Sequence, residues 1–133
     1  RRPLNMVLLD TCTLLWLVQD YRQLPAKVQA TLHKKQGAIY VSAISAFEIG
    51  VKYQKKKLSL PLKPADWFQE ALEFHGLTEL PLTAKILFAA TALPPHHTDP
   101  ADRILIATAV FHKLVLLTPD DEIRKYSGVK TVW

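Results

Sequence analysis

Two aspartates in this sequence each come shortly after an unbroken apolar run. Asp10 follows residues 6–9, and Asp120 follows residues 114–117 at a distance of three positions. Short apolar runs without alternation are typical of strands that are buried on both faces of a parallel sheet. Ligands of such sheets bind beyond the carboxyl ends of the strands, so both aspartates are expected at one rim. The alternative is that each aspartate only caps the helix that follows it.

Three more carboxylates, Glu48, Asp99 and Asp102, fall in segments with helical patterns. Glu48 lies close to the apolar stripe of its helix, but it also fits a capping box with Ser45 or an ion pair with Lys52. Asp99 precedes a proline, as a helix N-cap often does, and Asp102 would then stand in the first turn, where an acid suits the helix dipole. Spacing alone leaves these structural roles open.

Carboxylates that converge at one rim require a compensating charge. Two of them about 4 Å apart repel by roughly 4 kcal/mol at an effective dielectric near 20. Hard oxygen ligands without clustered histidine or cysteine select Mg²⁺ or Mn²⁺. Such ions generate a nucleophilic water and stabilise a phosphodiester transition state. The acids therefore indicate phosphoryl chemistry if they meet, which their spacing does not establish.

The composition describes a globular chain of one domain, residues 1–133. The 133 residues are 49% hydrophobic and 22% charged, and none of the apolar runs reaches the roughly 20 residues of a membrane span. The apolar segment 6–18 follows Arg1 and Arg2, but Asp10 interrupts it and no signal-peptide cleavage site follows, so we expect folded structure there. Residues 1–5 are expected to be a ragged start.

The net charge and the cysteine content indicate the class of partner and the redox environment. The net charge of +5 weakly favours an anionic partner such as nucleic acid. The single cysteine, Cys12, excludes an internal disulfide and a cysteine-rich zinc site, which suits the reducing cytoplasm. We expect Cys12 to be a packed, neutral thiol.

Strand and helix patterns alternate along the whole chain, which predicts a mostly parallel sheet of about five short strands with helices on both faces, a three-layer α/β/α arrangement. Strands are expected at residues 6–9, 38–41, 77–80, 114–117 and 129–133. Helices are expected at residues 14–20, 25–35, 43–51, 65–74, 84–92, 100–111 and 121–126, with a loop at 93–98.

Four stretches of the sequence resemble PIN-domain proteins, in particular the VapC-type toxin ribonucleases of bacterial toxin–antitoxin pairs. The matching stretches are Leu8-Leu9-Asp10-Thr11, Ser42 to Lys52 with Phe47-Glu48-Ile49, His97-Thr98-Asp99-Pro100-Ala101-Asp102-Arg103, and Leu117-Thr118-Pro119-Asp120, and the closing Gly128-Val129 to Val132-Trp133 is also similar. Together they span almost the whole chain in the expected order. The resemblance implies a PIN-like fold.

The resemblance also implies roles for particular residues. Asp10, Glu48, Asp102 and Asp120 match the family's acidic quartet, which binds Mg²⁺ or Mn²⁺ and serves catalysis. Asp99, Thr11 and Thr118 match accessory positions beside the metal. Cys12 departs from the Asn or Ser that is more usual at its position. The implied partners are an RNA substrate, a cognate antitoxin whose tail lies across the acidic cleft, and a second copy of the chain in a homodimer.

Several other residues have two interpretations each. Lys52, Lys55 and Lys56 form a solvated helix end or contact the RNA phosphates. Arg103 steadies Asp102 or holds a phosphate. His96 and His97, in the loop before the acidic stretch, are expected to be surface residues, with substrate contact second and metal ligation last. The tryptophans are expected in the core or at an interface; they are Trp16, Trp67 and Trp133.

The sequence therefore favours a metal-dependent endoribonuclease, a cytoplasmic toxin held inactive by its antitoxin. A phosphatase with Asp10 as nucleophile is an alternative, but its usual Asp-x-Asp motif has Cys12 at the third position. A receiver-like domain would need a lysine after a late strand, and residues 117–119 offer none. A non-catalytic interaction module, whose acids only cap helices, is the remaining alternative.

Overall fold

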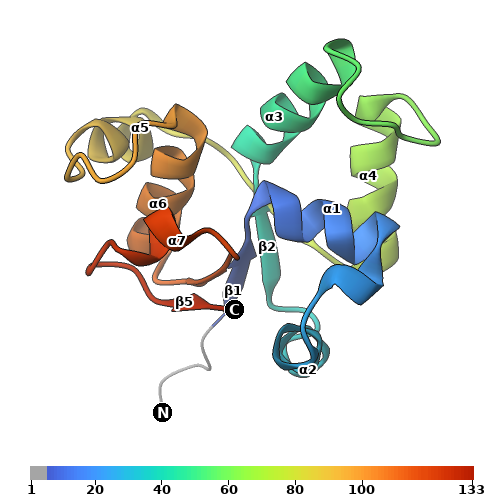
Figure 1. The fold of residues 1–133 in the computed structure, drawn as a ribbon, viewed down its shortest axis with the longest axis horizontal. Helices are drawn as coiled ribbons and strands as arrows, with labels where there is room; N and C mark the ends of the chain where they lie inside the picture. The colour runs from blue at the N-terminus through green and yellow to red at the C-terminus, as the bar shows by residue number, and fades with distance from the viewer. Residues whose placement is uncertain (1–5) are drawn as a thin grey trace.

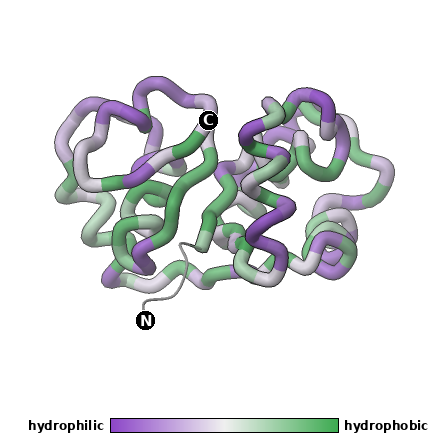
Figure 2. The backbone as a smooth tube through the Cα atoms, turned by 90° about the horizontal axis from the view of Figure 1, so that it is seen from below, coloured by the Kyte–Doolittle hydropathy of each residue, from purple (hydrophilic) through white to green (hydrophobic). Residues whose placement is uncertain are grey.

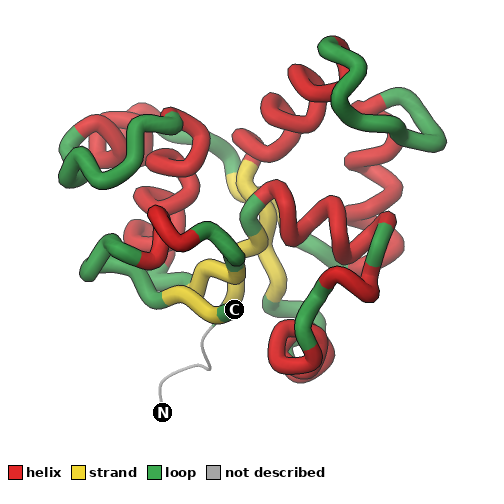
Figure 3. Tube along the Cα trace, in the orientation of Figure 1, coloured by secondary structure: helices red, strands yellow, loops and turns green. Residues whose placement is uncertain are grey.

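The computed structural model describes residues 6–133, and the ragged start expected at residues 1–5 lies outside this range. One five-stranded sheet runs through the described chain, and its strands are yellow in Figure 3. The strand order is β3-β2-β1-β4-β5, and all four strand pairings are parallel. The strands are β1 (Val7–Leu9), β2 (Ile39–Ser42), β3 (Thr78–Leu80), β4 (Val115–Leu117) and β5 (Thr131–Val132). The mostly parallel α/β prediction is confirmed, with β1 at the centre.

Helices cover both faces of the sheet (Figure 1). They are α1 (Thr11–Gln19), α2 (Ala26–Lys34), α3 (Ala43–Gln54), α4 (Pro64–His75), α5 (Ala84–Thr91), α6 (Pro100–His112) and α7 (Asp121–Arg124), with a 3-10 turn at Tyr21–Gln23. Helices α1, α2 and α4 pack on one face, and α6 and α7 pack on the other, where α5 lies against α6. This is the predicted three-layer arrangement.

Strand β1 is buried on both faces, which explains why its sequence does not alternate between apolar and polar residues. Val7 and Leu9 belong to the hydrophobic cluster under α1, α2 and α4, and Leu8 belongs to the cluster under α6 and α7. None of these three side chains is more than 1% exposed. The hydrophobic segments accordingly meet in the middle of the molecule, with polar segments mostly outside (Figure 2).

Helices α1, α3, α6 and α7 begin with a capping side chain close to the carboxyl ends of the strands. The carboxylate of Asp10 accepts a hydrogen bond from the backbone N–H of Thr13, and Ser42, Asp99 and Asp120 cap α3, α6 and α7 in the same way. Because Asp10 is the N-cap, α1 begins at Thr11 and not at the predicted residue 14. The capping alternative is therefore correct for all three aspartates, which does not exclude a second role.

The capping box considered for Ser45 and Glu48 is wrong, because α3 already begins at Ala43. Both side chains are left to make other contacts at the carboxyl rim of the sheet.

The tryptophans lie in packed positions, as expected. Trp67 is 3% exposed and donates its indole N–H to the side chain of Gln19. The rings of Trp16 and Trp133 lie 5.8 Å apart, which ties α1 to the last residue of the chain. Among the helices at residues 6–133, none has the length and hydrophobicity of a membrane span.

Candidate metal centre

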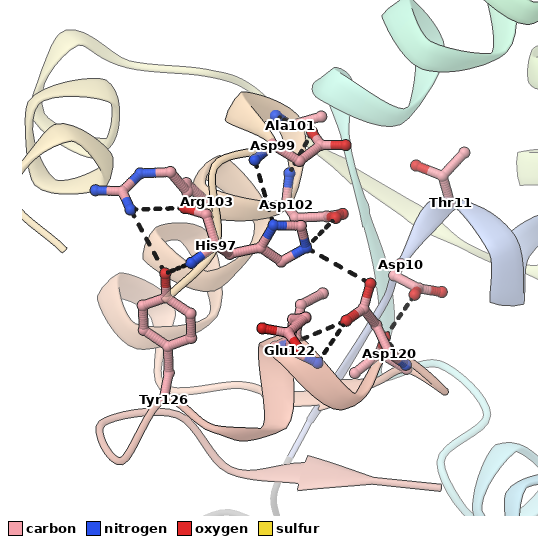
Figure 4. Close-up of polar contacts among 12 residues, drawn as sticks. Asp10, Thr11, His97, Asp99, Ala101, Asp102, Arg103, Asp120, Glu122 and Tyr126 are labelled. Carbon is pink, nitrogen blue, oxygen red and sulfur yellow. Dashed lines mark hydrogen bonds and ion pairs between the residues drawn. The ribbon is translucent and has the colours of Figure 1, made fainter. Parts of the chain in front are cut away.

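Asp10 and Asp120 lie at one rim because β1 and β4 are adjacent and in register, with Leu9 opposite Leu117. The hydroxyl of Thr118 links the two acids: it donates to Asp10 Oδ2 at 2.7 Å and accepts from the backbone N–H of Asp120 at 3.1 Å. Figure 4 shows both carboxylates beside the end of β1. Thr118 thus fixes their relative position and is itself fully buried.

Asp102 in α6 is common to two groups of side chains whose ligand atoms lie within 4.8 Å of one another. Glu48, Asp99 and Asp102 form the first group, and His97, Asp102 and Asp120 form the second. Asp10 belongs to neither group, although the charge of Asp120 acts on it. The structure therefore brings four of the five acids of interest into two overlapping donor sets and places Asp10 beside them.

A hydroxyl pair joins α1 to α3 at the same rim. The hydroxyl of Thr11 donates to Glu48 Oε1 and lies 2.8 Å from the hydroxyl of Ser45. Since the Thr11 proton is used on Glu48, Ser45 must be the donor in the second contact. Ser45 is completely buried and was not proposed as a site residue from the sequence. Its position one helical turn before Glu48 is the signal that would have found it.

Burial and mutual repulsion make these carboxyl groups hard to ionise. Burial raises the pKa of Asp10, against the hydrogen bonds from Thr118 and Thr13 that lower it. Burial also raises the pKa of Glu48. The pKa of Asp102 is raised to about 7, first by burial and then by the charges of Asp99 and Glu48. A rim that resists its own negative charge is a place where a cation would bind favourably.

The donors fit a divalent cation of the hard or borderline kind. Carboxylate oxygens dominate both groups, and the second group adds a ring nitrogen, His97 Nε2, that is buried and has no well-directed hydrogen bond. Oxygen ligands suit Mg²⁺, and Mn²⁺ also accepts nitrogen. The residues present are therefore compatible with the Mg²⁺ or Mn²⁺ expected from the sequence.

The two neighbouring histidines differ sharply. His96 is exposed as expected, with its ring edge-on to Tyr126 at 5.0 Å. The surface position expected for His97 is wrong: its side chain is 15% exposed, and Nε2 lies 2.8 Å from Asp102 Oδ2 and 3.6 Å from Asp120 Oδ2. The composition of the loop could not show which of the two histidines is buried, because this depends on how the loop folds onto α6 and α7.

The contact expected between Arg103 and Asp102 is not observed, and phosphate binding by Arg103 stays a prediction. Its guanidinium turns away from Asp102 and donates to backbone carbonyls of the preceding loop, at 2.8 Å for Leu93, 3.0 Å for Pro94 and 3.0 Å for His97. Its five donors suit such a set of acceptors. Arg103 is therefore the residue that holds this loop on the start of α6.

We expect Arg103→Met to lower the free energy of unfolding by about 2 kcal/mol, because several carbonyls lose a charged donor. Urea denaturation measures the change. Arg124→Met is the control: it removes an arginine whose only ion pair, with Asp121, lies at the surface, where such pairs contribute little. Equal stability of the two variants would show that the loop does not depend on Arg103.

Cys12 and the lysines lie around the acids. The pKa of the Cys12 thiol is raised to about 11, first by burial and then by Asp10, so it is neutral as expected. Lys52 follows Glu48 by one turn of α3 and is exposed, as are Lys55 and Lys56 at the end of that helix. Of the three, only Lys52 lies within α3; Lys55 is its C-cap and Lys56 follows in the turn.

The raised pKa of Asp102 predicts an unusual pH dependence of stability in the absence of metal. The folded protein holds this proton up to about pH 7, whereas the unfolded chain releases it near pH 4, so the free energy of unfolding falls as the pH rises through that window. The raised pKa values of Asp10 and Glu48 act in the same direction. Thermal unfolding in EDTA from pH 5 to pH 8 measures the trend.

The matched experiment uses Asp102→Asn, for which we expect the free energy of unfolding to fall clearly less between pH 5 and pH 8 than it does for the wild type. A wild-type stability that rises from pH 5 to pH 8 in EDTA would contradict the electrostatic picture of this rim.

Comparison with known proteins identifies relatives of the whole chain. The family model of the PIN domain matches residues 7–129. Ribonuclease VapC22 of Mycobacterium tuberculosis is 33% identical over 134 residues, which cover 98% of this chain and 100% of that protein.

Solved structures with the same fold come from several bacteria. A DNA-bound VapBC from Salmonella typhimurium superimposes with a TM-score of 0.70 and 17% identity, covering 97% of this chain and 98% of the other. VapBC2 from Rickettsia felis, bound to a promoter DNA fragment, superimposes with a TM-score of 0.72 and 16% identity, covering 96% of this chain and 98% of the other. FitAcB from Neisseria gonorrhoeae superimposes with a TM-score of 0.66 and 26% identity, covering 96% of this chain and 97% of the other.

Proposed function

Because this chain belongs to the PIN-domain family, we propose that it is a metal-dependent endoribonuclease and the toxin of a toxin–antitoxin pair. The observation that carries the proposal is Asp102, which is shared by two donor groups and has a pKa raised by burial and by neighbouring acids. The similar ribonuclease from Mycobacterium tuberculosis supports RNA as the substrate. Asp10, Glu48, Asp102 and Asp120 would hold Mg²⁺ or Mn²⁺, with Asp99 as a further donor.

A bound divalent ion supplies a Lewis acid, which favours ionisation of water and offsets charge that develops on the phosphate. The residues of the chain set the geometry around it. Thr118 keeps Asp10 in place, and the Ser45–Thr11 hydroxyl pair keeps Glu48 Oε1 in place. Glu48, whose pKa is raised by burial, is suited to take the proton of the attacking water as general base.

The basic end of α3 is proposed to bind the RNA backbone. Lys52 is exposed in α3 one turn after Glu48, and its charge acts on Glu48, while Lys55 and Lys56 are exposed in the turn that follows the helix. A phosphate held by Lys52 would therefore lie near Glu48. Contacts of this kind are independent of sequence and weaken with salt.

We further propose a protein partner and a homodimer. Several solved neighbours are complexes described as VapBC, and one is described as a toxin-antitoxin complex from Klebsiella pneumoniae. Phe47, next to Glu48, is 67% exposed, and Phe88 on α5 is 74% exposed. Large exposed aromatic side chains are typical of protein interfaces. An antitoxin that covered Phe47 would also cover the acids, and we propose that the pair acts in the cytoplasm.

A phosphatase with Asp10 as nucleophile is disfavoured by the contacts of Asp10. Its Oδ1 accepts from the Thr13 N–H, its Oδ2 accepts from Thr118, and the residue is only 6% exposed. With little exposure and a hydrogen bond on each oxygen, Asp10 is poorly placed to reach a phosphorus atom, whereas the remaining lone pairs of its oxygens can still face a small cation.

The test is cleavage of a mixed set of structured and single-stranded RNAs by the purified chain with Mg²⁺, Mn²⁺ or EDTA. We expect endonucleolytic products with either metal and none in EDTA, and sequencing of the 5′ ends gives the cut site. Cleavage that persists in EDTA would refute the metal dependence. A chain that binds these metals but cuts none of the RNAs would refute the ribonuclease.

A further inference from the structure

His97 places an imidazole ring among the acids. Its Nε2 is completely buried and lies 2.8 Å from Asp102 Oδ2 and 3.6 Å from Asp120 Oδ2, yet it makes no well-directed hydrogen bond (Figure 4). Its distance from two carboxylate oxygens allows two opposite roles. The nitrogen either binds the metal through a lone pair, or it presents a proton to the carboxylates.

The other ring nitrogen decides between these roles. The backbone N–H of Asp99 donates a hydrogen bond to His97 Nδ1 at 3.2 Å. Nδ1 therefore carries the lone pair, and the proton of the neutral ring is on Nε2. A histidine that binds a metal through Nε2 instead turns its Nδ1–H toward an acceptor. The surroundings of His97 thus favour a donor that faces the carboxylates.

The loop holds the ring in this orientation. The backbone N–H of His97 donates to the hydroxyl of Tyr126 at 2.8 Å, and its carbonyl accepts from Arg103 at 3.0 Å. Tyr126 is 4% exposed and donates in turn to the carbonyl of Pro94 at 2.8 Å. With both backbone groups and Nδ1 engaged, the imidazole cannot turn over without breaking contacts.

We propose that His97 is a positioning residue for the metal centre: the Nε2 edge of its ring lies against Oδ2 of Asp102 and Asp120 and orients both carboxylates, by electrostatic attraction and contact, for a divalent cation that His97 does not itself bind. The contact to Asp102 is close but not well directed, so the carboxylate remains able to turn toward the cation. The inference rests on the proposed function, because it concerns the same site. Donors that orient metal-binding groups are worth about 10- to 100-fold in affinity.

The experiment separates the two nitrogens of the ring by substitution and uses Mn²⁺ as the probe, with free Mn²⁺ measured by its EPR signal. H97N keeps an acceptor near Nδ1 for the Asp99 N–H but lacks the group at Nε2. H97Q places an amide donor near Nε2. We expect H97N to bind Mn²⁺ about tenfold or more weakly than the wild type, and H97Q to recover most of that loss. H96N, on the neighbouring exposed histidine, is the control and should bind as the wild type does.

Pulsed EPR of the bound Mn²⁺ gives a readout that a merely structural role would not change. We expect no coupling to a ligated histidine nitrogen in the wild type. Such a coupling, if lost in H97N, would overturn the proposal in favour of direct ligation. Equal affinity of H97N and the wild type would also overturn it. The ribonuclease proposal would survive either result if the wild type binds Mn²⁺ and cleaves RNA, so the two failures are distinguishable.

Discussion

Asp10→Asn is expected to lower RNA cleavage by about 10²- to 10³-fold or more while the protein remains folded. The substitution removes a negative charge that a cation at this rim would require. The asparagine side chain can still accept the hydrogen bond from the Thr13 N–H that begins α1. The loss should therefore be chemical and not structural.

The stability of the same variant provides an internal check. Burial raises the pKa of Asp10, so a neutral amide removes the cost of a buried charge, while the NH2 group of asparagine cannot accept the hydrogen bond from Thr118. Since these effects oppose each other, we expect the metal-free variant to stay within about 1 kcal/mol of the wild type at pH 8. Single-turnover cleavage and thermal unfolding measure the two effects. Asp121→Asn, at an exposed acid next to Asp120, is the control, and it should change neither the cleavage rate nor the thermal stability. Full activity of Asp10→Asn would refute the assignment of the site.

Asp102→Asn is expected to have a comparable effect on cleavage and a larger one on metal binding. Asp102 is the one acid that belongs to both donor groups, so its loss removes a ligand from each. We expect the affinity for Mn²⁺ to fall by tenfold or more. We also expect the free energy of unfolding in EDTA at pH 8 to rise, because the variant no longer carries a negative charge that burial and neighbouring acids disfavour. Calorimetric titration and denaturation measure these changes.

Asp99→Asn is the informative comparison for Asp102→Asn. Asp99 Oδ1 already caps α6 by accepting from the N–H groups of Ala101 and Asp102, and an asparagine can do the same. A smaller loss in Asp99→Asn would mean that Asp99 is mainly a cap. If Asp102→Asn bound Mn²⁺ as tightly as the wild type, the cation would have to lie elsewhere on the rim.

The sequence predicted the strands that carry the site better than the side chains that meet in it. The apolar runs before Asp10 and Asp120 predicted two buried strands, and the sheet confirms that these lie side by side. The approach of Glu48 and Asp102 depends on how α3 and α6 sit against the sheet, which spacing does not encode. Only the resemblance to a family suggested those two residues.

The errors have physical causes of the same kind. One role expected for Arg103 was to steady Asp102, but the loop before α6 offered its guanidinium backbone carbonyls that needed donors. His97 was expected at the surface, as its neighbour His96 is, because a polar loop gives no sign of which ring folds inward. Ser45 was interpreted within its own helix, whereas its partner, Thr11, is 34 residues away.

Asp10, Asp99 and Asp120 are at once the first capping groups of three helices and candidate ligands, and this double duty governs how the site can be dissected. Each gives Oδ1 to the backbone of its helix and keeps Oδ2 for other contacts. Replacement by alanine removes the charge and the cap together, at about 1 kcal/mol for the cap alone. An alanine scan would confuse a frayed helix with a lost ligand, whereas asparagine keeps the cap on Oδ1 and removes the charge together with the second acceptor oxygen, which at Asp10 accepts from Thr118. The choice of substitution, as much as the choice of residue, determines what a loss of activity means in this protein.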